Sequence, residues 1–149
     1  MKLFKEIRSI LLLLAFVLLA TSPAFADEWQ TDYKAALQQA TKEKKMVLVD
    51  FTGSDWCGWC IKLDKEVFSK SEFKNYAKKN LILLKVDFPR SKPQSAGLKQ
   101  QNQELKQKFA IQGYPTVIVL DSNGQQAGKL GYMEGGPKAF LGELDKLKK

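Results

Sequence analysis

The two cysteines of this chain, Cys57 and Cys60, lie within the segment Trp56-Cys57-Gly58-Trp59-Cys60. The 149 residues include no histidine, which excludes Ser-His-Asp catalysis, Cys-His catalysis and every histidine-bearing zinc site. Two thiols are also too few for a four-thiolate zinc site or for a framework of several disulfides. Any chemistry must therefore come from this thiol pair, or from carboxylates, lysines or phenols.

The cysteine pair follows a predicted buried strand and opens a predicted helix, a position with a specific chemical use. Side chains three residues apart on the first helical turn are close enough to form and break a disulfide. Unpaired backbone N–H groups and the helix dipole stabilise an anion there, which is expected to lower the pKa of the Cys57 thiol. Cys57 is thus the expected nucleophile. Cys60, one turn deeper and more shielded, is expected to resolve a mixed disulfide.

Three other interpretations of the pair compete with redox chemistry. A structural disulfide is one, although closing so short a loop stabilises by only about 2 kcal/mol in the chain-entropy account. A metal site is another, but it would lack further thiol or imidazole ligands within the chain, so no metal is expected. An inert buried pair is the third, and it is unexpected between two tryptophans in a loop. Redox chemistry is the favoured interpretation.

Hydrophobic periodicity predicts alternating helices and strands around this motif. Strands are predicted at 46–51, 81–87, 116–120 and 125–130, and helices at 31–44, from the cysteine motif onward, at 98–109 and from Pro137 onward. Ser69 and Glu72 have the spacing of a capping box for one further helix. Asn123-Gly124 predicts a hairpin turn between the last two strands, because both residues tolerate positive φ. The order αβαβαββα predicts an α/β fold with a mixed sheet covered on both faces.

The first 26 residues have the pattern of a cleaved secretory signal peptide. A basic start precedes an unbroken apolar run at 10–20, and Ala-Phe-Ala at 24–26 then supplies a cleavage site. The run is shorter than the roughly 20 residues needed to span a membrane, although an uncleaved anchor stays an alternative. We therefore expect a signal peptide at 1–26 and a single domain at 27–149.

The formal net charge of +8 could indicate an anionic partner. The lysines, however, are scattered over the predicted helices, where they form the polar faces that solvated helices carry. The sequence contains neither an Arg-rich cluster nor an RNA-binding signature. No nucleic-acid partner is therefore expected.

Several motifs together resemble the thioredoxin family across residues 29–148. They are the Cys57–Cys60 motif, the strand Val47-Leu48-Val49-Asp50-Phe51, the segment Gly113-Tyr114-Pro115-Thr116 and the later segments 121–125 and 129–131. This combination is highly specific, whereas two cysteines at this spacing alone would be moderate evidence. The resemblance implies a thioredoxin-like fold, in which helices flank both faces of a central mixed sheet, and no cofactor.

The resemblance also implies roles for individual residues. Cys57 would be the attacking thiol, Cys60 the resolving thiol, and Asp50 a buried acid that accepts the Cys60 proton. A satisfied carboxylate at a strand end is the alternative for Asp50. Pro115 would be a cis-proline facing the cysteine pair, rather than a proline tolerated at the start of a strand. The expected substrate-binding surface also includes Trp56, Gly58, Trp59, Tyr114 and Gly131, with Met133 beside them.

Departures from the family pattern bear on the chemistry. The lysine that often partners the buried acid corresponds to Leu83, and Lys85 on the same face is a candidate substitute. Gly-Trp replaces the Gly-Pro of cytosolic thioredoxins between the cysteines. The segment 88–103 is longer than theirs, and the family's first strand has no room before Thr31. These features resemble exported bacterial thioredoxin-related proteins and the periplasmic C-terminal domain of the transmembrane disulfide reductase.

The resulting hypothesis is a periplasmic thiol–disulfide oxidoreductase that reduces protein disulfides through a Cys57–Cys60 cycle. No helical subdomain of the kind found in exported disulfide-introducing enzymes is inserted in the domain, which favours reduction over oxidation. The expected substrates are disulfide-containing proteins, the expected partner is a membrane thiol-electron donor, and the expected state is a monomer. Two alternatives stay open: a disulfide oxidase or isomerase, and a non-enzymatic, chaperone-like protein-binding module.

Overall fold

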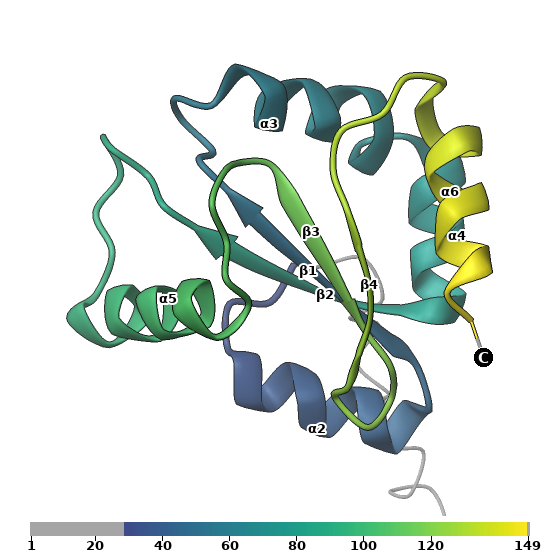
Figure 1. The fold of residues 1–149 in the computed structure, drawn as a ribbon, viewed down its shortest axis with the longest axis horizontal. Helices are drawn as coiled ribbons and strands as arrows, with labels where there is room; N and C mark the ends of the chain where they lie inside the picture. Colours follow the sequence, from purple (N-terminus) through teal and green to yellow (C-terminus); the bar gives the residue numbers. More distant parts are fainter. Residues whose placement is uncertain (1–28, 149) are drawn as a thin grey trace, which may run out of the picture.

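The computed structural model describes residues 29–148, which form a four-stranded sheet between two layers of helices (Figure 1). In chain order the elements are α2 (Tyr33–Glu43), β1 (Met46–Thr52), α3 (Gly58–Leu63), the π-helical turn η1 (Asp64–Phe68), α4 (Ser71–Asn80), β2 (Leu81–Asp87), α5 (Ala96–Lys108), β3 (Thr116–Leu120), β4 (Gln126–Leu130) and α6 (Gly136–Lys146). The predicted signal peptide at 1–26 lies outside the described residues. None of the helices between 29 and 148 is long and apolar enough to cross a membrane.

The sheet has the strand order β2-β1-β3-β4 and is mixed. β1 and β2 run parallel, so the chain between them must cross over, and it does so through α3, η1 and α4. β3 lies antiparallel to β1, and β4 lies antiparallel to β3. β1 and β3 are therefore the central strands, which explains why both are almost entirely apolar and buried.

Alternate residues of β1 contribute to two separate cores. Val47, Val49 and Phe51 pack in the layer that holds α2 and α5. Leu48 packs in the other layer, which is covered by α3, α4 and α6. Because side chains alternate between the faces of a strand, Asp50 lies on the same face as Leu48. The pattern of the strand thus places a carboxyl group under the helix that begins at the cysteine motif.

An aromatic cluster holds the helices of this second layer together. The ring of Phe68 lies 4.9 Å from that of Phe73 and 5.6 Å from that of Phe140, measured between ring centroids. Phe73 and Phe140 are 6.2 Å apart, and Trp29 packs 5.1 Å from Phe68. These separations are in the range in which aromatic pairs attract beyond their burial. η1, α4 and α6 therefore meet at one packed centre.

The α/β architecture predicted from the sequence is confirmed, and the predicted strand boundaries agree with the structure to within one residue. The predicted helices at 31–44 and 98–109 correspond to α2 and α5, shifted by one or two residues at their ends. Asp32, one of the two caps expected for α2, accepts a hydrogen bond from the N–H of Ala35. At the start of the described residues, Gln30 pairs with Leu84 of β2 in a single parallel bridge.

The predicted capping box of Ser69 and Glu72 is wrong. The Ser69 hydroxyl donates to the Asp64 carboxylate at 3.1 Å, and its N–H donates to the Asp64 carbonyl at 2.8 Å. Ser69 therefore closes the π-helical turn behind it rather than opening α4. The residue before α4 is Lys70, whose side chain makes no capping hydrogen bond.

The hairpin turn after β3 is present, but not through two positive φ angles. Of the two turn residues Asn123 and Gly124, only Gly124 has a positive φ, of 80°. The Asp121 carboxylate accepts hydrogen bonds from the N–H groups of Asn123 and Gln125, both at 2.9 Å. The side chain of Asp121 thus organises a wider loop, and β4 begins at Gln126 instead of the predicted Gln125.

The aromatic cluster predicts a large effect of Phe140→Ala. Because this side chain is fully buried, its removal should lower the free energy of unfolding by about 3–5 kcal/mol in urea denaturation. Lys138→Ala, at an exposed position of the same helix, is the matched control and should change it by less than about 0.5 kcal/mol. A loss below about 1 kcal/mol for Phe140→Ala would contradict the central place of the cluster.

Candidate active site

Cys57 and Cys60 form a disulfide at the start of α3, with their Cα atoms 5.2 Å apart. Cys57 is the N-cap residue of this helix, and its sulfur accepts a hydrogen bond from the N–H of Cys60 at 3.2 Å. Only 6% of Cys57 and 5% of Cys60 is exposed, so the expected stronger shielding of Cys60 is not seen in this oxidised state. The first helical turn nevertheless directs the Cys60 N–H, which has no partner within the helix, at the Cys57 sulfur, as expected from the sequence.

A tight turn delivers the chain from β1 to this helix. The carbonyl of Gly53 accepts hydrogen bonds from the N–H groups of Trp56 and Cys57, at 3.2 and 2.8 Å. The indole of Trp56 folds back over Gly53, where a Cβ atom would overlap the ring. Glycine is therefore required at this position by close approach, a constraint that the sequence analysis did not identify.

Trp56 joins three segments of the site. Its indole N–H donates to the Phe88 carbonyl at 2.7 Å, and its ring meets that of Tyr114 edge-on at 5.9 Å. The guanidinium carbon of Arg90 lies 4.1 Å from the centroid of the Trp56 ring. Trp56 is 36% exposed, so it serves as an anchor with one accessible face.

The loop at 88–95 is part of the site, although the sequence marked this segment only as longer than its counterpart in cytosolic thioredoxins. The Asp55 carboxylate accepts from the backbone N–H groups of Arg90 and Ser91, at 2.9 and 2.7 Å. These two hydrogen bonds lower the pKa of Asp55. Ser54 donates through its N–H and its hydroxyl to Asp87 at the end of β2. The two loops at this edge of the sheet are thus fastened together.

The Tyr114–Pro115 peptide bond is cis, as the resemblance implied. Pro115 precedes β3, and the loop that contains it passes beneath α3 (Figure 1). The carbonyl of Pro115 would lie 3.8 Å from a Cβ built on Gly131, so these two predicted residues are neighbours. Thr116 steadies the loop through a 2.8 Å hydrogen bond from its hydroxyl to the Gly113 carbonyl.

Trp59 is the most exposed large apolar side chain among the described residues, at 58%. Its ring packs 5.1 Å from that of Tyr132, and the Lys62 ammonium lies 5.1 and 4.9 Å from the two ring centroids. Tyr132 donates from its hydroxyl to the Glu66 carboxylate at 2.7 Å. Tyr132 and Lys62 were not predicted. The three-residue spacing of Trp59 and Lys62 on a helix was the available signal.

Gly58 and Met133, two further residues of the predicted surface, differ in their surroundings. Gly58 is exposed, and a Cβ there would meet no atom within 4 Å. The space around Gly58 therefore does not require glycine. Met133 is half-buried and packs against the core that α3, α4 and α6 cover.

Asp50 is 4% exposed, and its Oδ1 atom has no hydrogen-bond partner. Burial raises the pKa of this carboxyl to about 7, and the charge of Lys85 opposes the rise. Lys85 is the register neighbour of Asp50 on β2, but no ion pair joins them, and its ammonium instead lies 5.2 Å from the Trp29 ring centroid. Lys85, the candidate substitute for the family lysine, thus affects Asp50 by long-range electrostatic attraction and not by a direct ion pair.

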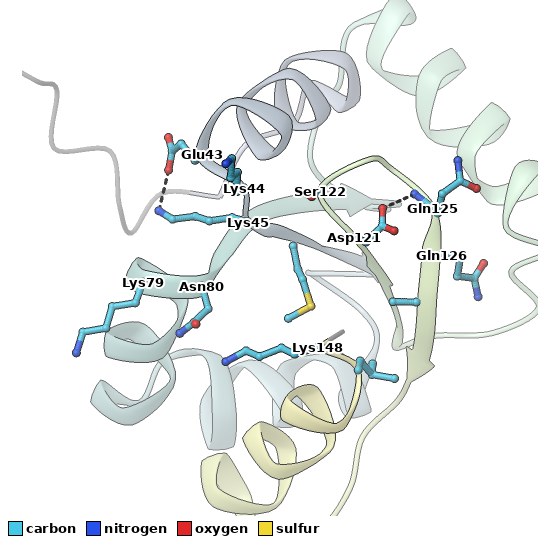
Figure 2. Close-up of a pocket in the computed structure, with 13 residues that line it drawn as sticks. Glu43, Lys44, Lys45, Lys79, Asn80, Asp121, Ser122, Gln125, Gln126 and Lys148 are labelled. Carbon is cyan, nitrogen blue, oxygen red and sulfur yellow. Dashed lines mark hydrogen bonds and ion pairs between the residues drawn. The ribbon is translucent and has the colours of Figure 1, made fainter.

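A separate cavity of about 350 Å³ lies at the opposite end of the sheet, where β1 begins and β3 ends. Figure 2 shows Lys45, Lys79 and Lys148 around it, and Met46 and Leu147 also line it. Neither cysteine lines it, so it has no part in thiol chemistry. Among residues 29–148, no three thiol or carboxylate side chains gather in a metal-binding arrangement.

Comparisons with known proteins agree with this geometry. A family model described as thioredoxin-like matches residues 28–122. The disulfide bond reductase DsbH of Chlamydia pneumoniae is 36% identical over 117 residues, which are 78% of this chain and 70% of that protein. The thioredoxin-related protein DsbJ of the same organism is 35% identical over 103 residues, 69% of this chain and 30% of that protein. A solved structure of a DsbH oxidoreductase matches with a TM-score of 0.76 at 35% identity, covering 87% of this chain and 91% of that one.

The raised pKa of Asp50 predicts that the stability of the oxidised protein falls as the pH rises. The folded carboxyl keeps its proton up to about pH 7, whereas the unfolded one loses it near 3.8. Between pH 3.8 and about pH 7, folding is therefore accompanied by uptake of a proton at Asp50. The stability that the protonated Asp50 contributes is fully present below pH 3.8 and is lost as the pH rises through about 7. Asp50→Asn should flatten this fall and stabilise the protein at pH 8 by on the order of 2–4 kcal/mol.

Urea unfolding at about pH 4.5 and at pH 8 measures this difference. Asp55→Asn is the matched control, because it removes a carboxyl whose pKa is lowered, and it should not flatten the fall. Equal pH dependence in the parent protein and in Asp50→Asn would show that Asp50 does not titrate in this range.

Proposed function

The chain belongs to the thioredoxin-like family, and from this premise we propose that it is a periplasmic thiol–disulfide oxidoreductase that reduces the disulfides of other proteins. The observation that carries the proposal is the Cys57–Cys60 disulfide at the N-terminus of α3, bordered by Trp56 and Trp59. The name of the relative, disulfide bond reductase, supports the direction of the reaction.

The first step belongs to Cys57. In the reduced protein the Cys60 N–H that now meets the Cys57 sulfur would stabilise a thiolate, since a charge-assisted hydrogen bond is stronger than a neutral one. The thiolate attacks one sulfur of the substrate disulfide. A bond forms between Cys57 and that sulfur, the substrate S–S bond breaks, and the leaving thiolate takes a proton from water.

The second step releases the substrate. Cys60 loses its proton and attacks the Cys57 sulfur, which breaks the mixed disulfide and yields the Cys57–Cys60 disulfide. Two electrons have then passed to the substrate, which leaves as two thiols. We assign the Cys60 proton to Asp50, because a buried carboxyl with a pKa of about 7 can both accept and return a proton near neutral pH.

The surface around the pair would hold the substrate. The exposed ring of Trp59 and the half-buried ring of Tyr114 supply apolar contacts on two sides of the disulfide. The backbone before β3 at Pro115 is a pairing edge for an extended substrate segment, and Gly131 leaves the space beside it free of side-chain atoms.

The compartment and the partners follow from the same proposal. Cleavage after residue 26 would leave the domain at 27–149 in the periplasm, where it would act as a monomer. A reductase in an oxidising compartment must be re-reduced after each cycle, so a membrane thiol-electron donor is the proposed partner.

Cysteine variants test the cycle. Cys57→Ser should lower the turnover of a disulfide-bonded protein substrate by at least about 10³-fold, because the nucleophile is lost. Cys60→Ser should instead accumulate a mixed disulfide with the substrate, visible by non-reducing electrophoresis and by mass spectrometry. The double variant is the control and should form no adduct.

Normal turnover by either single variant would overturn the proposal. If the chain is instead a chaperone-like module whose cysteines take no part in its function, all three variants should still bind the substrate, and none should form a covalent adduct.

A further inference from the structure

We propose that one side of the cysteine pair is a binding surface for acidic segments of the substrate proteins. This surface, the cationic rim, consists of Arg90 and Lys106 with the rings of Trp56, Phe88 and Tyr114. The inference rests on the proposed function and adds the class of substrate that the site prefers.

The two cations of the rim are held on aromatic rings that border the disulfide. Arg90 stacks on Trp56, the residue before Cys57, with its guanidinium carbon 4.1 Å from the ring centroid. The Lys106 ammonium lies 5.4 Å from the centroid of Tyr114. Tyr114 immediately precedes the cis-proline. Arg90 therefore contacts the residue that precedes Cys57, and Lys106 contacts the residue that precedes the cis-proline.

The rings themselves form a continuous row between the two cations. Phe88 lies 5.3 Å from Tyr114, and Tyr114 lies 5.9 Å from Trp56. The Lys106 ammonium is also 5.6 Å from the Phe88 ring centroid. The row fixes the positions of both cations relative to one another, because each ring is in turn held by its neighbour.

Neither cation forms an ion pair with a carboxylate of the described residues. Among residues 29–148 the ion pairs involve other lysines, and none contains Arg90 or Lys106. A cation–π contact attracts a cation without cancelling its charge, so the charge stays available to an anion from solution. Asp55 and Asp87 lie on the same side and keep their negative charges, but they accept hydrogen bonds from backbone and hydroxyl groups of the two loops and not from the Arg90 guanidinium.

On the other side of the cysteine pair, carboxylates balance the positive charge of the lysine. Lys62, which lies over Trp59 and Tyr132, is 4.0 Å from the Glu66 carboxylate. The charges of Glu66 and Glu134 both act on it. On the rim side, Arg90, Lys106 and Lys92, whose ammonium lies 3.4 Å from the Ser54 hydroxyl, outnumber the carboxylates of Asp55 and Asp87. The field around the disulfide is therefore asymmetric, with its positive side at the rim.

This asymmetry selects among substrates. A carboxylate of an approaching segment can form charge-assisted hydrogen bonds with the Arg90 guanidinium and the Lys106 ammonium, whereas a basic segment is repelled. Such charge complementarity acts on the rate of encounter and on specificity more than on overall affinity. An acidic segment on the Phe88 side would therefore guide the substrate disulfide onto Cys57.

The test compares three disulfides with the purified protein under a fixed dithiol supply. Two are cyclic disulfide peptides that differ only in flanking glutamates or lysines, and the third is the neutral bis(2-hydroxyethyl) disulfide. At low ionic strength we expect kcat/KM to be about tenfold higher for the acidic than for the basic peptide. Arg90→Gln and Lys106→Gln should each lower this ratio about threefold, and salt at about 0.5 M should bring it close to one.

Two variants separate the rim from a general effect of charge. Lys108→Gln removes the same charge two residues further along α5, where the ammonium stacks on Tyr33 and Phe109 instead, and it should leave the ratio unchanged. Arg90→Lys keeps the charge and should keep most of the preference. A ratio that falls as far in Lys108→Gln as in Lys106→Gln would overturn the inference.

The neutral disulfide distinguishes this inference from the proposed function. A protein that reduces it but treats the two peptides alike overturns the cationic rim and leaves the oxidoreductase standing. A protein that reduces none of the three disulfides overturns both.

Discussion

Strand β1 has a neighbouring strand on each edge and helices over both faces, so every side chain along it must face one of two apolar layers. That constraint determines the chemistry at its end. It forces the one carboxyl of the strand, Asp50, into the layer beneath α3, where loss of solvent raises its pKa. It also delivers the chain to Gly53, whose lack of a side chain lets the turn close and places Cys57 as the cap of α3. The nucleophile and the proposed proton acceptor thus come from the same strand.

The loops around the pair are held by contacts between segments far apart in sequence. Asp55 fastens the chain before the cysteines to the loop after β2, and Trp56 adds a hydrogen bond to the same loop. This brings Arg90, from a loop without regular structure, to the edge of the disulfide. A fixed position of these charges is what allows the site to discriminate among substrates, since a cation on a mobile loop would lose entropy on each encounter.

Regular patterns in the sequence were sufficient for the fold and for part of the site. Apolar runs predicted the three buried strands β1, β2 and β3, because a strand buried on both faces leaves a continuous signature. The Asn-Gly turn predicted β4, an edge strand without such a run. The spacing of Cys57 and Cys60 and the motif around Pro115 predicted the centre. Long-range side-chain contacts left no such signature. Ser69 could serve either turn beside it, and only its two hydrogen bonds to Asp64 show which one it closes. The Asp55–Arg90 contact likewise joins residues 35 positions apart, with no periodicity to predict it.

In the proposed function, the Cys57–Cys60 pair cycles between dithiol and disulfide and acts as a reductant. The most direct test is the equilibrium reduction potential of this pair, measured against defined thiol buffers and read out by thiol alkylation. We expect a value of about −250 mV or lower, at which the dithiol form can reduce ordinary protein disulfides when a donor resupplies its electrons. A value of about −150 mV or higher would contradict it, because such a pair would act in the periplasm as an oxidant or isomerase.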